Sequence, residues 1–409
     1  MKIKSISIEY FKGLRNVDIP EFDEHVNLLL GINGAGKSSV LDAISLVFSW
    51  YTARILSAKG RGRDIPKDDI AIHSQNGCTI DLGMDDGHHW KLYRSLKYKK
   101  TDKSDLSAMN QRVAQLRNAL DSDSNQSVPV IIHYGVNRVI PNTYPRLPRG
   151  KNEFSQLDTY RNALSSGQSF SDFFNWFRLA EEYENAQYKS DSSFLDHGLE
   201  AVRRCMASIL PEYSDLKVNH RPLALTMKKG NETLKLNQLS DGEKCYISLV
   251  CDIARRLAIA NPSSDPLMGE GIVLIDEIDL HLHPQWQQSI VSRLVNTFPN
   301  CQFFITSHSP IVASDVNGKV FGIKEGEIVP QYTYGKLSSN ILTSAFEVSS
   351  LRNPFVQSLF DAGYEALDRN DINLYTKNLN QLSDILGADD IDITSLRIEK
   401  LRREKFARK

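Results

Sequence analysis

The stretch GINGAGKS at positions 31–38 decides the fold of this chain. It fits the pattern G-x-x-x-x-G-K-S of a phosphate-binding loop, with an apolar run at 25–30 before it and a helix-like segment at 39–50 after it. Glycines let the backbone approach phosphate groups, and the N-terminus of the following helix adds a favourable positive end. The stretch therefore predicts a strand, a phosphate loop and a helix of an α/β fold.

Two side chains of this loop have predicted roles. Lys37 is expected to reach the β- and γ-phosphates of a nucleotide, and the Ser38 hydroxyl is expected to ligate Mg²⁺. A chance glycine-rich turn is the alternative, which the strand–loop–helix context disfavours. Four further nucleotide contacts are predicted: Asn33, Gly34 and Gly36 in the same loop, and Ser39 directly after it.

A second motif, GIVLIDE at 271–277, is an apolar run that ends in two carboxylates. It is typical of a buried parallel strand that ends at the ligand edge of a sheet. We expect Asp276 to hold the Mg²⁺ and Glu277 to orient or deprotonate the attacking water. An apolar strand followed by an acidic turn is common, so this interpretation depends on the phosphate loop.

His308 follows the next apolar run, in CQFFITSHSP at 301–310. A histidine just beyond a strand can form a hydrogen bond with a γ-phosphate and so detect it. An ordinary loop histidine is the alternative. The position of His308 after Asp276, with a helix expected between them, favours a catalytic role shared with Glu277.

LSDGEK at 239–244 predicts the start of a helix that runs to about Ala260. Ser240 and Gly242 would leave free backbone N–H groups and a hydroxyl pointing outward. Asp241 and Glu243 suit the first turn electrostatically. A plain N-cap is the alternative interpretation.

In this order, the motifs resemble the ABC-type ATPase superfamily, in its soluble SMC/RecF/OLD branch. Lys37 and Ser38 match its Walker A residues, Asp276 and Glu277 its Walker B pair, and 239–244 its signature loop. The resemblance is firm over about 1–60 and 230–325, although position 241 is Asp where transporters carry Gly. Three more residues take family roles by resemblance: Asp279 in the D-loop, His308 as the switch histidine, and Lys12 near the nucleotide. No clear Q-loop glutamine is present, and Asn137 is assigned to its place.

The resemblance implies that the signature serine of one subunit completes the ATP site of another. Two ATP molecules would then lie between the subunits of a head-to-tail dimer, and a larger assembly is left open. Hydrolysis of ATP with Mg²⁺ is the implied activity. The implied fold class is an α/β split ABC-type head with a mixed α+β insertion and a helical C-terminal region.

Four segments are predicted: an N-terminal lobe at 1–100, a mostly helical insertion at 101–230, a C-terminal lobe at 231–335, and a helical region at 336–409. The insertion contains an amphipathic pattern at 104–120, too short for a long coiled-coil arm. It also contains a Pro-rich basic loop at 141–151 and an aromatic helix from 170, for which core packing is favoured over a partner surface.

The composition limits the partners. The formal net charge is −1, so no global basic field indicates nucleic acid. Basic clusters at 97–103 and 397–409 leave open either solvated surface or contact with DNA or RNA. The five cysteines show no C-x-x-C spacing, and MKIKSISIEY reads as a strand, not a signal peptide. A cytoplasmic protein with no membrane contact is expected.

Rival chemistries are less well supported. His281-x-His283 has no second ligand pair at zinc spacing. The acidic residues after His308 lie in a polar loop, with no pattern of the Toprim domain that follows the head in OLD nucleases, so no nuclease activity is expected from this chain.

Compact heads without Toprim resemble the ATPase subunits of bacterial anti-phage systems, of which the Septu type works with an HNH nuclease subunit. We therefore expect an ATPase that regulates a separate effector. A RecF/SMC-like DNA-repair clamp is the alternative, and a structural pin that hardly turns ATP over is a third.

Overall fold

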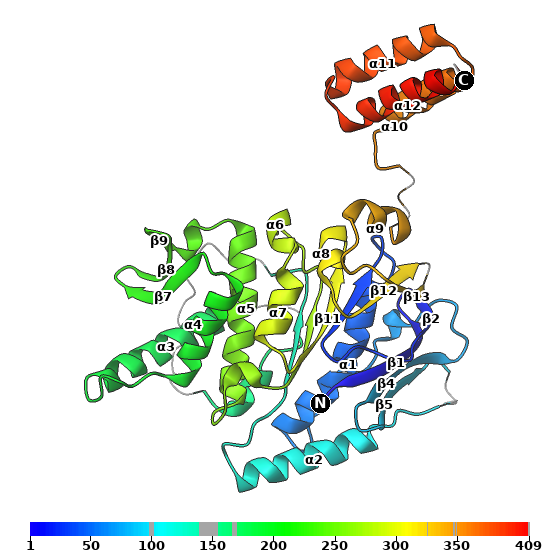
Figure 1. Ribbon diagram of the computed structural model, residues 1–409. Coiled ribbons are helices and arrows are strands. Elements are labelled where there is room, and N and C mark those ends of the chain that lie inside the picture. The colour runs from blue at the N-terminus through cyan, green and yellow to red at the C-terminus, as the bar shows by residue number, and fades with distance from the viewer. Residues whose placement is uncertain are drawn as a thin grey trace. The chain divides into compact units, whose positions relative to one another are not determined.

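The computed structural model describes residues 1–97, 102–138, 154–165, 170–324, 326–346, 348 and 350–407. It divides into two units, Met1–Ile341 and Leu342–Lys409. Figure 1 shows the elements of each unit. The basic loop predicted at 141–151 lies outside the described residues, as do 98–101 of the first basic cluster and 408–409 of the second.

A six-stranded sheet forms the centre of the first unit, with the order β13-β12-β3-β11-β10-β6. Five strands are parallel, and β13 pairs with β12 antiparallel. The carboxyl ends of the parallel strands therefore share one edge, which is where ligands bind in such sheets. In sheet order the strands are β13 (Glu327–Gln331), β12 (Lys319–Lys324), β3 (Val26–Leu30), β11 (Cys301–Ser307), β10 (Gly271–Ile275) and β6 (Val130–Tyr134).

The predicted insertion at 101–230 is not separate from the head, because it contains strand β6 of the central sheet. This strand pairs parallel with β10 and forms one edge of the six-stranded sheet of the head. All five of its residues are buried, so they complete the core of the parallel sheet and not a separate subdomain. The range 101–230 also contributes β7 (Tyr213–His220) and β8 (Leu223–Lys229) to a small sheet with β9 (Glu232–Lys235).

Helix α1 (Lys37–Leu56) packs against strands of both larger sheets. By length and composition it could cross a membrane, but 67% of its most apolar window is buried inside the protein. It is therefore the core helix of the head. The second large sheet is antiparallel, in the order β2 (Leu14–Ile19), β1 (Ile3–Phe11), β4 (Gly77–Met84) and β5 (His89–Ser95).

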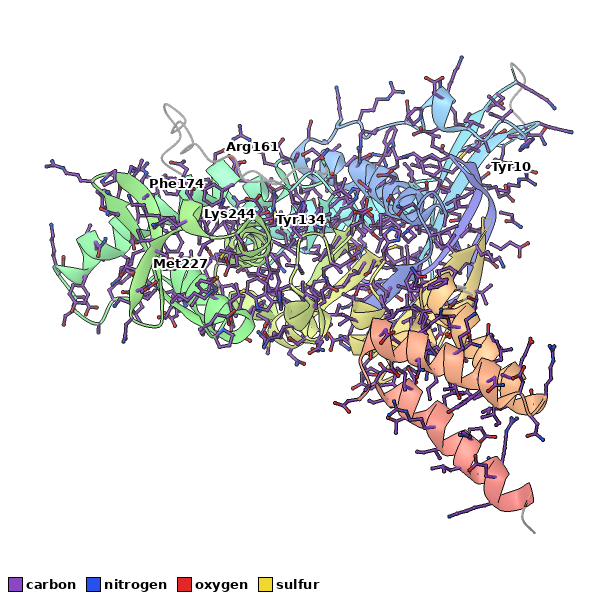
Figure 2. All side chains as sticks on the ribbon, turned by 90° about the horizontal axis from the view of Figure 1, so that it is seen from above. Tyr10, Tyr134, Arg161, Phe174, Met227 and Lys244 are labelled. Carbon is purple, nitrogen blue, oxygen red and sulfur yellow. The ribbon has the colours of Figure 1, made fainter. Side chains whose placement is uncertain are left out.

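Helix α5 (Asp241–Ala260) is tied to β6 by buried charges. Tyr134 donates a hydrogen bond of 2.9 Å to Asp252, which also accepts from Arg255 at 2.6 Å and Arg256 at 2.8 Å. Burial opposes ionisation of Asp252, but the two guanidinium groups outweigh it and hold the pKa of Asp252 well below its usual range. The network fixes α5 against the sheet. Tyr134 is labelled in Figure 2.

The remaining helices of the first unit surround these sheets. They are α2 (Ser107–Ser122), α3 (Phe170–Tyr188), α4 (His197–Ile209), α6 (Pro284–Gln287), α7 (Ile290–Thr297), α8 (Pro310–Asp315) and α9 (Ser338–Ser344), whose last residues enter the second unit. In α3 the aromatic side chains of Phe173, Phe174 and Phe177 are buried, which confirms core packing for them. Figure 2 labels Phe174.

The second unit contains α10 (Pro354–Asp368), α11 (Ile372–Leu386) and α12 (Ile391–Ala407) around a small apolar core. This confirms the helical C-terminal region. The cations of α12 are largely paired. Arg403 contacts Asp368 at 2.6 Å and Glu399 at 2.9 Å, and Lys400 lies 3.6 Å from Glu404. These pairs favour the solvated helix face over a phosphate contact.

Candidate active site

The phosphate loop connects β3 to α1, as the sequence predicts. Ile32, Asn33 and Gly34 are exposed, so the loop presents its backbone to solvent. Gly36 caps α1 with φ 105°, and a Cβ atom there would lie 2.5 Å from Leu14 Cδ2. Any other residue would be strained at this φ and would displace the Leu14 side chain, so the position favours glycine.

Lys37 lies inside this loop. Its Nζ donates to the carbonyl oxygens of Gly31 at 2.9 Å and Ile32 at 3.1 Å. Burial lowers the pKa of Lys37, and the nearby carboxylates of Glu277 and Asp276 oppose that shift. The amine and the Walker B carboxylates therefore belong to one electrostatic site.

The Asp276 carboxylate accepts hydrogen bonds from two hydroxyl groups. Ser38 Oγ donates to Asp276 Oδ1 at 3.0 Å, and the buried Thr306 Oγ1 donates to the same oxygen at 2.5 Å. The hydroxyl and carboxylate predicted to hold Mg²⁺ thus come together from α1 and β10, and both are the hard oxygen ligands that this ion prefers. Thr306 was not predicted; its place in TSHSP, two residues before His308, is the signal that points to it.

Glu277 has an unusual backbone with φ 46°. Its N–H donates to Thr306 Oγ1 at 2.7 Å, and its carbonyl accepts from Arg138 Nη2 at 2.5 Å. A left-handed backbone costs about 1–3 kcal/mol, and such strain gathers at functional sites. The carboxylate Oε1 lies 3.9 Å from His308 Nε2, so the two predicted catalytic residues are adjacent.

His308 is partly buried beside Lys37. Burial lowers the pKa of His308, and the charge of Lys37 lowers it further. A lowered pKa favours the neutral imidazole, which has one donor and one acceptor nitrogen. A neutral donor suits a hydrogen bond to a phosphate oxygen.

Arg138 is the main site residue that sequence reasoning missed. It is buried, it binds the Glu277 carbonyl, and its own carbonyl accepts from Cys245 Sγ of α5 at 3.3 Å. The neighbouring Asn137, which was assigned to the Q-loop place, is exposed. Arg138 thus connects the Walker B turn to the signature helix. A basic residue four positions after the end of the buried strand β6 is the available signal.

Arg138→Gln is expected to reduce ATP turnover with little change in nucleotide affinity. The variant leaves the Glu277 carbonyl without its charged donor, a loss of about 1–3 kcal/mol, or roughly 5- to 150-fold in rate. Steady-state ATPase assays and nucleotide titrations measure the two effects. Asn137→Ala is the matched control; a larger loss in that variant would return the role to Asn137.

Lys12 forms an ion pair with Asp42 of α1, and its backbone N–H donates to Asp69 O at 2.6 Å. The pair is partly exposed, with a third of each side chain accessible. The side chain of Lys12, in the turn after β1, therefore packs against α1, the helix that follows the phosphate loop.

The signature stretch begins α5 as predicted. Ser240 Oγ accepts from the Glu243 N–H at 3.3 Å, while Glu243 Oε2 accepts from Ser240 N at 2.8 Å and from its hydroxyl at 2.9 Å. This is a capping box, which confirms the N-cap. A Cβ atom at Gly242 would lie 2.0 Å from the His281 carbonyl oxygen, so glycine is required for the D-loop to pass.

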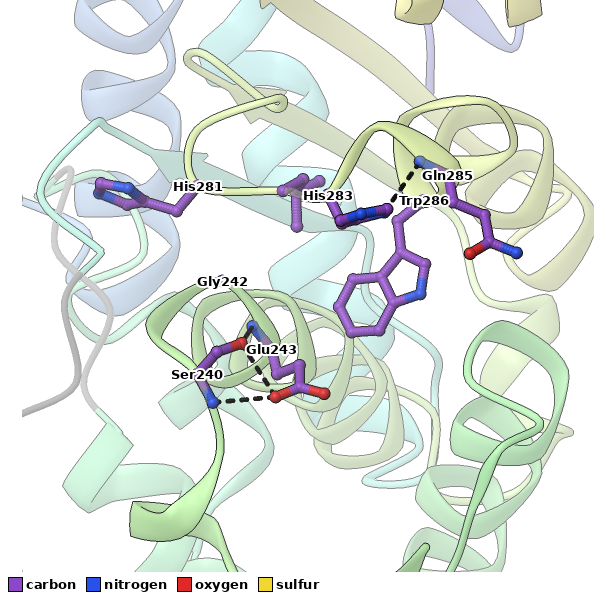
Figure 3. A pocket seen from close by; sticks show the side chains of 8 residues that line it. Ser240, Gly242, Glu243, His281, His283, Gln285 and Trp286 are labelled. Carbon is purple, nitrogen blue, oxygen red and sulfur yellow. Dashed lines mark hydrogen bonds between the residues drawn. The ribbon is translucent and has the colours of Figure 1, made fainter.

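A pocket of about 540 Å³ opens between the signature stretch and the D-loop. Figure 3 shows Ser240 and Gly242 on one side of it and His281 and His283 on the other. Among the described residues that line the pocket, none comes from the phosphate loop at 31–38. The pocket beside the signature stretch is therefore separate from the phosphate loop that contains Lys37.

The D-loop residue Asp279 has a buried Oδ1 that accepts no hydrogen bond from any described residue. A buried carboxylate oxygen without a donor calls for a partner. His283 caps α6, where its Nδ1 accepts from Gln285 N at 3.3 Å. Across the described part of the chain, no group of three or more His, Cys, Asp or Glu side chains is arranged to hold a metal ion.

The sequence model described as "RecF/RecN/SMC N terminal domain" matches residues 2–328. The chain belongs to this family. The match confirms the predicted resemblance to the SMC/RecF branch. The family and its phosphate loop also support ATPase activity and ATP binding.

Three curated relatives illustrate the membership. The Escherichia coli "Retron Ec83 probable ATPase" is 29% identical, with 98% of this chain and 87% of the relative covered. The "Septu protein PtuA" of Bacillus mycoides (strain KBAB4) is also 29% identical, and this chain spans about half of its length, with 52% covered. "DNA replication and repair protein RecF" of Aliivibrio salmonicida is 25% identical, over 80% of this chain and 99% of the relative.

Among solved structures, the SMC head domain from Thermotoga maritima covers 81% of this chain at 17% identity, with a TM-score of 0.45. RecF bound to an ATP analogue covers the same share at 16% identity, with a TM-score of 0.43. The family match and the parallel six-stranded sheet with its packed helices confirm the predicted α/β head.

Proposed function

We propose that this family member hydrolyses ATP in a head-to-tail dimer. Lys37, Asp276, Glu277 and His308 of one protomer would form each site, and Ser240 of the other protomer would complete it. The separate cavity beside Ser240 carries this proposal, because among the described residues no phosphate-loop side chain lines it.

The side chains suit the reaction. Lys37 would bind the phosphates, and Ser38 with Asp276 would hold Mg²⁺, which neutralises phosphate charge when bound. Glu277 would orient the attacking water and accept its proton, because Thr306 and Arg138 fix its backbone. His308 would donate a hydrogen bond to the γ-phosphate.

We further propose that the dimer regulates a separate effector in anti-phage defence, such as an HNH nuclease subunit. The relatives named as a retron ATPase and as a Septu protein support this assignment, because both match nearly the whole chain. The chain itself would cut no nucleic acid. A DNA-repair clamp is the second candidate, supported by the RecF relative that aligns over 99% of its length.

Co-purification from the native operon tests this proposal. The expected result is a complex of the ATPase with a nuclease encoded beside it, and the mass of the ATPase assembly should at least double when ATP and Mg²⁺ are added. The assembly should not grow when Lys37→Ala replaces the wild type. A mass that does not respond to ATP would contradict the dimer, and co-purification with replication proteins would support the repair clamp.

A further inference from the structure

Glu243 joins the signature serine to a different part of the protein. Its Oε2 atom accepts both hydrogen bonds from Ser240. Its Oε1 atom accepts from Lys229 Nζ at 2.8 Å and from the hydroxyl of Tyr213. One carboxylate therefore binds the N-cap of α5 on one side and the small sheet on the other.

Lys229 and Tyr213 form a unit within that sheet. They are register partners across β7 and β8, and Lys229 Nζ lies 3.0 Å from the Tyr213 hydroxyl and 4.9 Å from its ring centroid. Burial opposes ionisation of Glu243, but the bonds from Lys229, Tyr213 and Ser240 outweigh it and lower the pKa of Glu243 to about 2. The carboxylate is therefore an anion throughout the physiological range, with one cation bound to it.

That anion lies beside the hydroxyl that a partner's triphosphate would approach. An unpaired carboxylate there would repel the phosphates and would hold the Ser240 hydroxyl more strongly as its own donor. Lys229 compensates the charge of Glu243, and Tyr213 saturates the oxygen that faces away from Ser240. The sheet thus sets how readily Ser240 can turn its hydroxyl to another acceptor.

We propose that Lys229 and Tyr213 are positioning residues for the signature serine. They act through Glu243, and they make the α5 N-terminus receptive to the nucleotide held by the partner protomer. The inference rests on the proposed function, because it requires that Ser240 completes a partner's site. It extends that function by making the sheet β7-β8-β9 a part of the ATPase machinery.

Lys229→Met tests the inference. We expect turnover and ATP-dependent dimerisation to fall by about tenfold or more, the effect of one uncompensated like charge near the phosphates, with nucleotide binding by the single protomer unchanged. Lys229→Arg should restore both. The matched control is Lys228→Met, because Lys228 is the preceding residue of β8 and pairs instead with Asp215 at 3.0 Å; it should behave as wild type.

A double-mutant cycle separates positioning from a structural role. In a Glu243→Gln background there is no charge to compensate, so Lys229→Met should change turnover by less than about twofold. An equal loss in both backgrounds, or no loss in either, would overturn the inference. Ser240→Arg, measured in the same assay, shows which of the two proposals has failed. If Lys229→Met and Ser240→Arg both leave turnover intact, the dimer proposal itself is wrong; if only Lys229→Met does, the positioning role alone is wrong.

Discussion

Glu277→Gln is expected to lower ATP turnover by a factor on the order of 10²–10⁴, the usual contribution of a positioned base. The amide keeps the shape of the side chain but cannot accept the proton of the attacking water. Binding should persist, because Lys37 and the backbone bonds of residue 277 to Thr306 and Arg138 are retained. ATP should therefore accumulate on the enzyme without being cleaved.

Light scattering with single-turnover kinetics measures this trapped state. The variant should double in mass with ATP and Mg²⁺ and should remain a dimer after free nucleotide is removed. Glu277→Gln combined with Lys37→Ala is the control, and it should stay at its starting mass. If ATP leaves the mass of Glu277→Gln unchanged, ATP does not hold two heads together.

Ser240→Arg is expected to abolish hydrolysis while a single protomer still binds ATP. The bulky cation would fill the pocket between the signature stretch and the D-loop, so a partner's nucleotide could not approach α5. Loss of the capping box would cost about 1 kcal/mol of helix stability, which is too little to unfold the head. Equal loss of binding and hydrolysis would place Ser240 in its own protomer's pocket.

Ser240→Asp supplies a second variant that keeps the N-cap. Asp can accept the N-cap bond from the Glu243 N–H, but it cannot donate to Glu243 Oε2 as Ser240 does, and its charge would repel phosphate. Hydrolysis should fall, while the free energy of unfolding should drop by only about 1–3 kcal/mol, the cost of the lost hydrogen bond. A fully active Ser240→Asp would show that no phosphate approaches this helix end.

Much of the site could be predicted because its residues follow parallel strands. Lys37, Asp276 and His308 come after β3, β10 and β11, which are neighbours in the sheet, so their side chains must share one edge. The motif spacing indicated the strands, and the sheet order brought the residues together. The same arrangement places the Glu277 carboxylate 3.9 Å from the His308 imidazole.

The missed contacts depend on pairings that no local pattern reveals. Arg138 lies 139 positions before Glu277 and reaches it only because β6 is a strand of the central sheet. The bond between Lys229 and Glu243 requires that the small sheet packs beside the N-terminus of α5. Sequence periodicity gives the elements, but it does not give their neighbours.

The basic C-terminal helix shows the same limit. The sequence left a solvated face and a phosphate contact open, since a run of Arg and Lys is compatible with both. The partner of Arg403 is Asp368 in another helix, so only the folded unit shows that this cation is already engaged. Its pairing with Glu399, one helical turn away, could have been predicted.

Mixing Lys37→Ala with Ser240→Arg tests the central claim most directly. Neither variant alone should hydrolyse ATP. In a mixed head-to-tail dimer, one site combines both defects and the other combines an intact Lys37 with an intact Ser240. We predict recovery of about a quarter to a half of the wild-type rate: each mixed dimer has one intact site, and mixed dimers make up half of the dimers if pairing is random and more if neither variant pairs with itself. No recovery in the mixture would contradict a site shared between two protomers.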